Sequence, residues 1–267
     1  MQIDPQPGDM RLPLRDLNLP AGAVHLWHMD MCTLPDLASI NQQAEDNKVD
    51  PSQMQPRQWR FLQRFYLRLL LAAHLRQPAH AVRIGKTASG KPFIQPPRAK
   101  SAHNTTAASA TASSRPPLYF SVSHVGSVML VALCRDAPVG VDMEAVQRRV
   151  RDPLRMARRY FHPAEVYWLQ SLSSAELGSA FMRLWTCKEA VVKATGGGIV
   201  SGLDRFAVAL ADNAASLTAA INEPEDDVLH SLRISLPRFS DDQHVALAHT
   251  ADSNRLRLFR LAQRQLR

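Results

Sequence analysis

One stretch decides the fold of this chain, and it predicts a helix that ends at glycine: Trp185-Thr186-Cys187-Lys188-Glu189-Ala190-Val191-Val192-Lys193-Ala194-Thr195-Gly196-Gly197-Gly198-Ile199. Apolar residues recur there at helical spacing, namely Phe181, Leu184, Trp185, Val191 and Val192. Glu189 and Lys193 are four residues apart, so both project from one face of the helix, with Lys188 beside them. Gly196 ends the helix because glycine adopts the left-handed cap conformation without a Cβ clash. A carboxylate and two lysines at a helix end suit a site that handles phosphate and metal together, although a surface Glu–Lys pair with a glycine cap has the same pattern.

The composition is that of a globular protein. The chain has 267 residues, of which 45% are hydrophobic and 21% are charged, and this length allows one large domain or two small ones. No apolar run is long enough to cross a bilayer, and residues 1–9 are too polar for a secretory signal. The three cysteines, Cys32, Cys134 and Cys187, show no metal-ligand spacing. We therefore expect a reduced, cytoplasmic location.

A formal net charge of +8 indicates an anionic partner: nucleic acid, a membrane surface, a phosphorylated small molecule or an acidic protein. Part of this charge lies on a predicted helix, Pro56 to Gln77, whose apolar residues form one stripe. Arginines occupy its other side at steps of three and four residues: Arg57, Arg60, Arg64 and Arg68. This basic row is either a solvated face or a surface that meets phosphate, for which the guanidinium fork is suited.

A second motif carries two carboxylates. From Val139 to Val146 the residues alternate, which predicts a strand with Asp142 and Glu144 on one face and Val141 and Met143 on the other. Two carboxylates on one strand face repel each other unless a cation lies near them. Mg²⁺ fits such a face because it binds one or two carboxylates and leaves its other positions to water and phosphate. The alternative is an edge strand with a polar outer face.

A short strand, Val82 to Ile84, is predicted to lead into a turn, Gly85 to Phe93, that contains Lys91. Its glycines allow close backbone approach and its lysines add charge, but the spacing excludes a Walker phosphate-binding loop because Pro92 follows Lys91. The next segment, about 95–117, is low in complexity and is expected to be a flexible loop.

A second hairpin is predicted from two β-rich runs, Leu118 to Val122 and Ser127 to Leu133. Ser123 and His124 would lie at its tip. A hydrolytic pair is not indicated, since adjacent residues rarely form a nucleophile–base pair and no nucleophile-elbow motif is present.

The remaining elements are predicted from periodicity, with a boundary between halves at Asp136-Ala137-Pro138. We expect residues 1–137 to form an N-terminal half and residues 138–267 a C-terminal half that carries the metal site. Ser179 or a nearby serine is the expected cap of the central helix. The other expected elements are a strand within Ala23 to Met29, a helical stretch up to Phe161, a helix from Glu165 to Leu172, strands within Phe206 to Leu210, Leu232 to Leu236 and Val245 to Ala248, and a strand or short helix from Arg255 to Leu261.

Taken together, the motifs resemble those of the 4′-phosphopantetheinyl transferase superfamily, in its long two-half form, the Sfp type. The resemblance covers about residues 56–210. Asp-x-Glu and Trp-x-x-Lys-Glu-x-x-x-Lys are specific only in combination. The matching motifs are Gly90-Lys91-Pro92, Phe120-Ser121-Val122-Ser123-His124, Gly140-Val141-Asp142-Met143-Glu144, Arg159-Tyr160-Phe161 followed by Glu165, and Trp185-x-x-Lys188-Glu189-Ala190-x-x-Lys193.

This resemblance implies an α+β fold of two similar halves related by a pseudo-twofold axis. Each half would be a helix packed on a small antiparallel sheet, with the active site in the cleft between them. It also implies transfer of the 4′-phosphopantetheine arm of coenzyme A to a serine of an apo acyl or peptidyl carrier protein, with release of adenosine 3′,5′-bisphosphate. The carrier would be acidic, and the enzyme would work as a monomer without nucleic acid or membrane.

The resemblance also implies roles for individual residues. Asp142, Glu144 and Glu189 would hold Mg²⁺. Glu189, or a water beside it, would be the base for the serine hydroxyl, and Lys188 and Lys193 would stabilise charge on the pyrophosphate. The nucleotide would be held by Lys91, Pro92, Ser123 and His124, with Arg64 as a further candidate. The segment 95–117 is longer than the family usually has at this place.

Two rival hypotheses remain at this stage. The +8 charge and the arginine row also suit a basic nucleic-acid-binding protein, although no recognition module is present. A non-catalytic relative could bind coenzyme A or a carrier as a scaffold. The clustered carboxylates argue against the scaffold, and the sequence does not choose among carriers of fatty-acid, polyketide or peptide synthesis.

Overall fold

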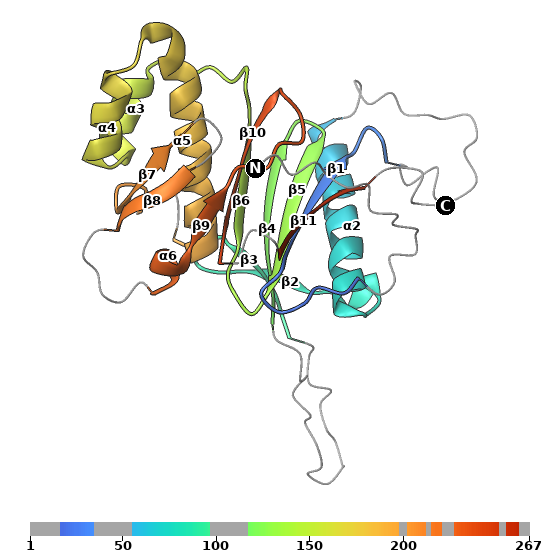
Figure 1. The fold of residues 1–267 in the computed structure, drawn as a ribbon. Coiled ribbons are helices and arrows are strands. Elements are labelled where there is room, and N and C mark those ends of the chain that lie inside the picture. The colour runs from blue at the N-terminus through green and yellow to red at the C-terminus, as the bar shows by residue number, and fades with distance from the viewer. Residues whose placement is uncertain are drawn as a thin grey trace, which may run out of the picture.

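The computed structural model describes residues 17–34, 55–96, 117–197, 202–211, 215–220, 227–250 and 255–261. Their helices and strands form successive layers, in which two sheets lie between the long helices α2 (Pro56–Leu75) and α5 (Ser174–Thr195) (Figure 1). One hydrophobic cluster fills the space under α2, a second lies between the two sheets, and a third lies under α5. The fold is therefore mixed α+β, as the resemblance implied.

The first sheet has the order β11-β1-β5-β4. Its strands are β11 (Leu256–Leu261), β1 (Val24–Asp30), β5 (Val128–Arg135) and β4 (Leu118–Val125). β1 pairs with β11 in parallel, and the other two pairings are antiparallel. This departs from the expected halves in two ways, because the sheet is not wholly antiparallel and its edge strand β11 comes from the C-terminal end of the described chain.

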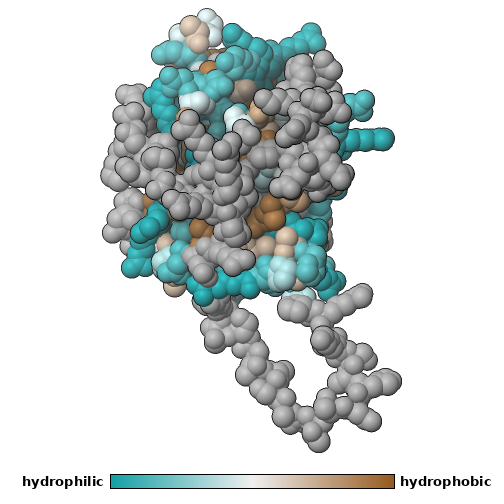
Figure 2. All heavy atoms as spheres, turned by 90° about the vertical axis from the view of Figure 1, so that its right-hand side faces the viewer, coloured by the Kyte–Doolittle hydropathy of each residue, from teal (hydrophilic) through white to brown (hydrophobic). Residues whose placement is uncertain are grey.

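Helix α2 packs on this sheet as its apolar stripe predicted. Leu62, Tyr66 and Leu70 are buried in the cluster under the helix, whereas all four arginines of the basic row are exposed. The helix begins at Pro56, where a missing N–H costs nothing, and ends at Arg76 in the left-handed conformation. On the side of the molecule where α2 lies, the described surface is largely hydrophilic, with small hydrophobic patches (Figure 2).

The second sheet has the order β6-β10-β9-β8-β7. Its strands are β6 (Gly140–Ala145), β10 (Gln243–His249), β9 (Arg233–Ser235), β8 (Ala215–Ala220) and β7 (Phe206–Leu210). Helix α5 lies on this sheet, and the short helices α3 (Pro153–Tyr160), α4 (Pro163–Gln170) and α6 (Asp227–Ser231) complete this side. β8 and α6 were not predicted from the sequence.

Local sequence signals explain where α5 begins and ends. Ser173 and Glu176 form a reciprocal capping box at the first turn, so the cap lies before the expected Ser179. Gly196 adopts φ 80° at the C-terminal end, which confirms the predicted glycine cap. Gly198 and Ile199 lie outside the described residues.

The two hairpins carry residues of interest toward α5. β2 (Ile84–Lys86) and β3 (Pro92–Ile94) form a small antiparallel pair after the single turn η2 (Ala79–Ala81). In the β4–β5 hairpin the turn lies at Gly126, with φ 55°, and not at Ser123 and His124. That prediction was wrong because the pairing continues to Val125, so Ser123 and His124 are strand residues opposite Leu130 and Met129.

The low-complexity segment falls mostly on residues 97–116, which lie outside the described residues. Among the helices that the structure describes, none is both long and apolar enough to span a bilayer.

Candidate active site

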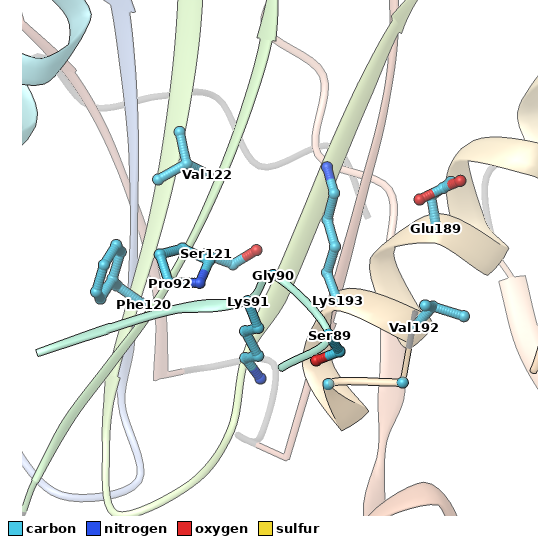
Figure 3. A pocket seen from close by; sticks show the side chains of 12 residues that line it. Ser89, Gly90, Lys91, Pro92, Phe120, Ser121, Val122, Glu189, Val192 and Lys193 are labelled. Atoms are coloured by element: carbon cyan, nitrogen blue, oxygen red, sulfur yellow. The ribbon is translucent and has the colours of Figure 1, made fainter. Parts of the chain in front are cut away.

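A cavity of about 260 Å³ opens between the β2–β3 hairpin, strand β4 and the C-terminal half of α5. Figure 3 shows its side chains arriving from the hairpin and β4 on one side and from α5 on the other. The lining residues are Ser89, Gly90, Lys91, Pro92, Phe120, Ser121, Val122, Glu189, Val192, Lys193, Gly196 and Gly197. The cavity thus joins three of the motifs found in the sequence.

Helix α5 reaches strand β6 because residue 140 has no side chain. A Cβ on Gly140 would lie 1.9 Å from the carbonyl oxygen of Ala190 and 2.4 Å from the backbone nitrogen of Ala194. No real Cβ tolerates such distances, so the helix backbone can rest on the strand only at a glycine. This contact brings Glu189 and Lys193 beside Asp142.

Asp142 is 5% exposed and holds the centre of the site. Its Oδ1 accepts hydrogen bonds from Lys193 Nζ at 2.7 Å and from Ser123 Oγ at 2.9 Å. Its Oδ2 is buried and has no hydrogen-bond partner within the described part of the chain. The opposite face of β6 places Val141 and Met143 in the cluster between the sheets, as the predicted alternation requires.

Glu189 lines the cavity and lies near Asp142. The pKa of its carboxyl is raised to about 7, mainly by burial and then by the nearby Asp142 and Glu144, while Lys193 and Arg148 offset part of the increase. Such a value suits a group that takes up a proton near neutral pH. Glu144 itself is paired with Arg148, four residues further along the chain.

The donor set fits a divalent cation. Asp142 Oδ2 is a buried oxygen without a partner, and hard cations such as Mg²⁺ prefer carboxylate oxygens. Among the described residues, however, no three His, Cys, Asp or Glu side chains are grouped closely enough to hold a metal by themselves. This is compatible with an ion that binds one or two carboxylates and completes its shell with water and phosphate. The three-carboxylate set of Asp142, Glu144 and Glu189 stays a prediction.

Lys91 and Pro92 both line the cavity. Lys91 Nζ donates a hydrogen bond of 2.6 Å to the carbonyl oxygen of Ala194, in the last turn of α5. Burial lowers the pKa of the Lys91 ammonium. The lysine therefore ties the hairpin to the end of α5 while its side chain lines the cavity.

Ser123 and His124 lie on opposite faces of β4. Ser123 is buried, and its hydroxyl accepts a hydrogen bond from the backbone N–H of Met143 while it donates to Asp142. The side chain of Ser123 thus contacts Asp142, and its expected contact with a nucleotide stays a prediction. His124 is exposed and is not part of the cavity lining.

Two further predicted residues lie away from the cavity. Lys188 is 0% exposed, and its ammonium contacts Glu165 and the carbonyl oxygen of Phe206. It therefore does not reach the cavity from its place in α5, which corrects its assignment to the pyrophosphate. Arg64 is exposed on α2, across the sheets from α5 (Figure 1), so the structure does not bring it to the candidate site.

Ser121 joins strands β4 and β6, a role that no motif in the sequence indicated. Its hydroxyl accepts a hydrogen bond from the backbone N–H of Val141 at 3.1 Å, two residues before the equivalent bond of Ser123. The two serines thus take the place of part of a backbone ladder between β4 and β6. Their spacing was the available signal, because residues two apart on a strand share one face.

Comparisons with known proteins show which family the chain belongs to. The family model described as "4'-phosphopantetheinyl transferase superfamily" matches residues 138–259. The 4′-phosphopantetheinyl transferase HetI of Nostoc sp. (strain PCC 7120) is 30% identical over 200 residues, which cover 73% of this chain and 77% of the relative.

Two shorter alignments agree with it. The putative 4′-phosphopantetheinyl transferase slr0495 of Synechocystis sp. is 39% identical over 87 residues, 33% of this chain and 35% of the relative. A 4′-phosphopantetheinyl transferase of Bacillus subtilis is 33% identical over 98 residues, 37% of this chain and 42% of the relative. These two matches span less than half of each relative, whereas the match to HetI spans most of it. The chain therefore belongs to the 4′-phosphopantetheinyl transferase superfamily.

Proposed function

We propose that this protein is a holo-carrier-protein synthase, which transfers 4′-phosphopantetheine from coenzyme A to a serine of an apo carrier protein. One observation carries the proposal: Lys193, which is paired with the buried Asp142, and Glu189 line one side of a cavity that Lys91 lines from the other. Phosphoryl-group transfer depends mainly on positioning and on neutralising charge. Carboxylates and lysines at the rim of one cavity suit both needs.

In the proposed reaction one bond to phosphorus forms and one breaks. The serine oxygen forms a bond to the phosphorus that carries pantetheine, and the bond from that phosphorus to the adenosine 3′,5′-bisphosphate oxygen breaks. Glu189 accepts the serine proton, for which a carboxyl pKa of about 7 is suited. The Lys193 ammonium stabilises the negative charge that develops on the leaving phosphate, whether or not it stays bound to Asp142.

Asp142, Glu189 and, after release from Arg148, Glu144 are the residues that would hold Mg²⁺. When bound, the ion would neutralise pyrophosphate charge and orient the attacked phosphorus. Asp142 is fixed for this task by Ser123, which holds Oδ1 and leaves Oδ2 without a protein partner among the described residues.

Coenzyme A would lie in the cavity between the hairpin and α5. Lys91 would exchange its bond to Ala194 for a phosphate oxygen, and Pro92 with the glycine turn would let the nucleotide approach the backbone closely. His124 stays a candidate for the 3′-phosphate because its ring is exposed. Each of the two sheets carries one long helix, α2 on the first and α5 on the second, which supports a pseudo-twofold relation of the halves as part of this proposal.

The partner would be an acidic carrier protein, steered by the net charge of +8. Since both sides of the cavity come from one chain, a monomer suffices. The test is to incubate the protein with coenzyme A, Mg²⁺ and a panel of apo carriers, and to weigh each carrier intact. A gain of one phosphopantetheine group on at least one carrier is expected, and no gain on any of them would refute the proposal.

A further inference from the structure

Lys188 is a charged side chain that the proposed chemistry does not use. It is 0% exposed, yet it precedes Glu189 directly in α5. Its ammonium lies 2.8 Å and 2.7 Å from the two carboxylate oxygens of Glu165 and donates a 2.6 Å hydrogen bond to the carbonyl oxygen of Phe206. Three oxygen acceptors therefore surround this one ammonium inside the protein, as a buried cation requires.

Glu165 is held as firmly as its partner. Its Oε1 accepts a hydrogen bond from the backbone N–H of Val208 at 2.8 Å, and its Oε2 accepts one from the backbone N–H of His162 at 2.9 Å. The carboxylate thus fixes the start of α4 and strand β7 at the same point. The rings of Phe161 and Phe206 lie 5.4 Å and 4.2 Å from the ammonium and exclude water from the pair.

Helix α5 is consequently held on two sides next to Glu189. On one side its backbone touches Gly140 at Ala190 and Ala194. On another side Lys188 is tied to α4 and β7, and neighbouring residues of a helix point about 100° apart. Glu189 projects between these two contacts, toward Asp142.

We propose that the buried pair of Lys188 and Glu165 is a positioning device that sets the rotation of α5, and so aims the Glu189 carboxylate at Asp142. This inference rests on the proposed function, in which Glu189 takes the serine proton. Aliphatic side chains at 165 and 188 would fill the same space, but they would hold the helix only by packing, which tolerates rotation and sliding. An ion pair that is also hydrogen-bonded to three backbone groups, of Phe206, Val208 and His162, does not.

The test separates positioning from stability with three variants. Lys188→Met leaves the Glu165 carboxylate buried without its cation, so both the thermal midpoint and kcat should fall. The double variant Glu165→Gln with Lys188→Met buries no charge at this place, so the thermal midpoint should recover part of the loss, while the single amide oxygen accepts from only one of the backbone N–H groups of Val208 and His162. We expect kcat of the double variant to stay about tenfold or more below wild type, with KM for coenzyme A within about twofold, because the base is misaimed while binding is kept.

Arg135→Met is the matched control, because Arg135 is a buried cation of the other sheet that donates to the carbonyl oxygen of His74. Its loss should lower the thermal midpoint without changing kcat per folded molecule. A double variant with wild-type kcat would overturn the positioning role and leave the pair as a stabilising contact only. A wild-type protein that modifies no carrier would instead refute the proposed function, and the two failures are therefore distinguishable.

Discussion

Two clusters of buried ionisable side chains, one under α2 and one between β6 and α5, differ in whether their polar atoms all have partners. Under α2, His25 Nδ1 lies 3.3 Å from His74 Nε2, and His74 Nδ1 donates to the carbonyl oxygen of Leu70 at 3.0 Å. Burial lowers the pKa of His25 to about 3 and that of His74 to about 4. Neither ring has a buried nitrogen without a partner among the described residues, so this cluster is neutral and closed.

The second cluster, Asp142 and Glu189 between β6 and α5, differs because one of its buried polar atoms lacks a partner in the described residues. Asp142 keeps one buried oxygen without a partner in the described chain, and Glu189 has its pKa raised to about 7 by burial and by neighbouring carboxylates. This cluster borders a cavity, whereas the histidines are enclosed by Trp27 and Phe259. Burial of ionisable groups therefore does not by itself indicate a functional site. A buried charged group with an unpaired polar atom beside a cavity does, because a ligand can supply the missing partner.

The largest effect on this contrast is expected from replacing Glu189, the proposed base. Glu189→Gln keeps the shape of the side chain but removes proton uptake, so kcat should fall by about 10²–10⁴. The wild-type profile of kcat/KM should rise with pH through an inflection near 7, since the base must be ionised to act, and the variant should lack this inflection.

Glu176→Gln, in the exposed first turn of the same helix, is the control for this change. Glutamine also serves at that capping position, so both activity and pH profile should match the wild type. An unchanged inflection in Glu189→Gln would remove Glu189 from the role of base.

A smaller effect is expected from separating α5 from β6. Gly140→Ala forces a methyl group against the backbone at Ala190 and Ala194, so we expect a loss of about 1–3 kcal/mol in unfolding free energy together with reduced kcat. Gly178→Ala lies on the same helix with no atom within 4 Å of the added methyl, and should be neutral or slightly stabilising. Denaturant unfolding measures both, and equal stability of the two variants would contradict the close contact.

The smallest effect is expected for the two histidines under α2, which should influence the pH dependence of stability but not catalysis. Both histidines have folded-state pKa values below the unfolded value of about 6.5. Their neutral forms are thus preferred in the native state, so stability is highest above about pH 6.5 and falls as the pH decreases toward about 4. The slope should reach about 1.4 kcal/mol per pH unit for each histidine.

Urea unfolding at pH 7.5 and 5.5 measures this slope. Replacing both rings, as in His25→Leu with His74→Leu, should reduce it, whereas His230→Ala on the exposed side of α6 should not. An undiminished slope in the double variant would assign the acid sensitivity to other groups.

The features predicted correctly from the sequence are those that depend on local residue patterns. The apolar stripes gave α2 and α5, Gly196 gave the end of α5, and alternation gave the two faces of β6. It could not reveal that β11 pairs with β1, because that parallel pairing joins segments more than 200 residues apart and depends on the completed core.

The candidate site was predicted in part for a related reason. A helical pattern shows that Lys188 and Glu189 are neighbours, but not which of them faces the cavity once Gly140 and Glu165 have fixed the helix rotation. Likewise Ser123 was assigned to a turn because its run of β-forming residues looked complete at Val122, whereas cross-strand pairing extends it to Val125.

The most direct measurement is the intact mass of an apo carrier after incubation with coenzyme A, Mg²⁺ and either the wild type or Asp142→Ala, with circular dichroism to verify folding. The account predicts that the wild type adds one phosphopantetheine group and that the folded variant adds none on the same timescale. A folded Asp142→Ala protein that modifies the carrier at the wild-type rate would contradict it.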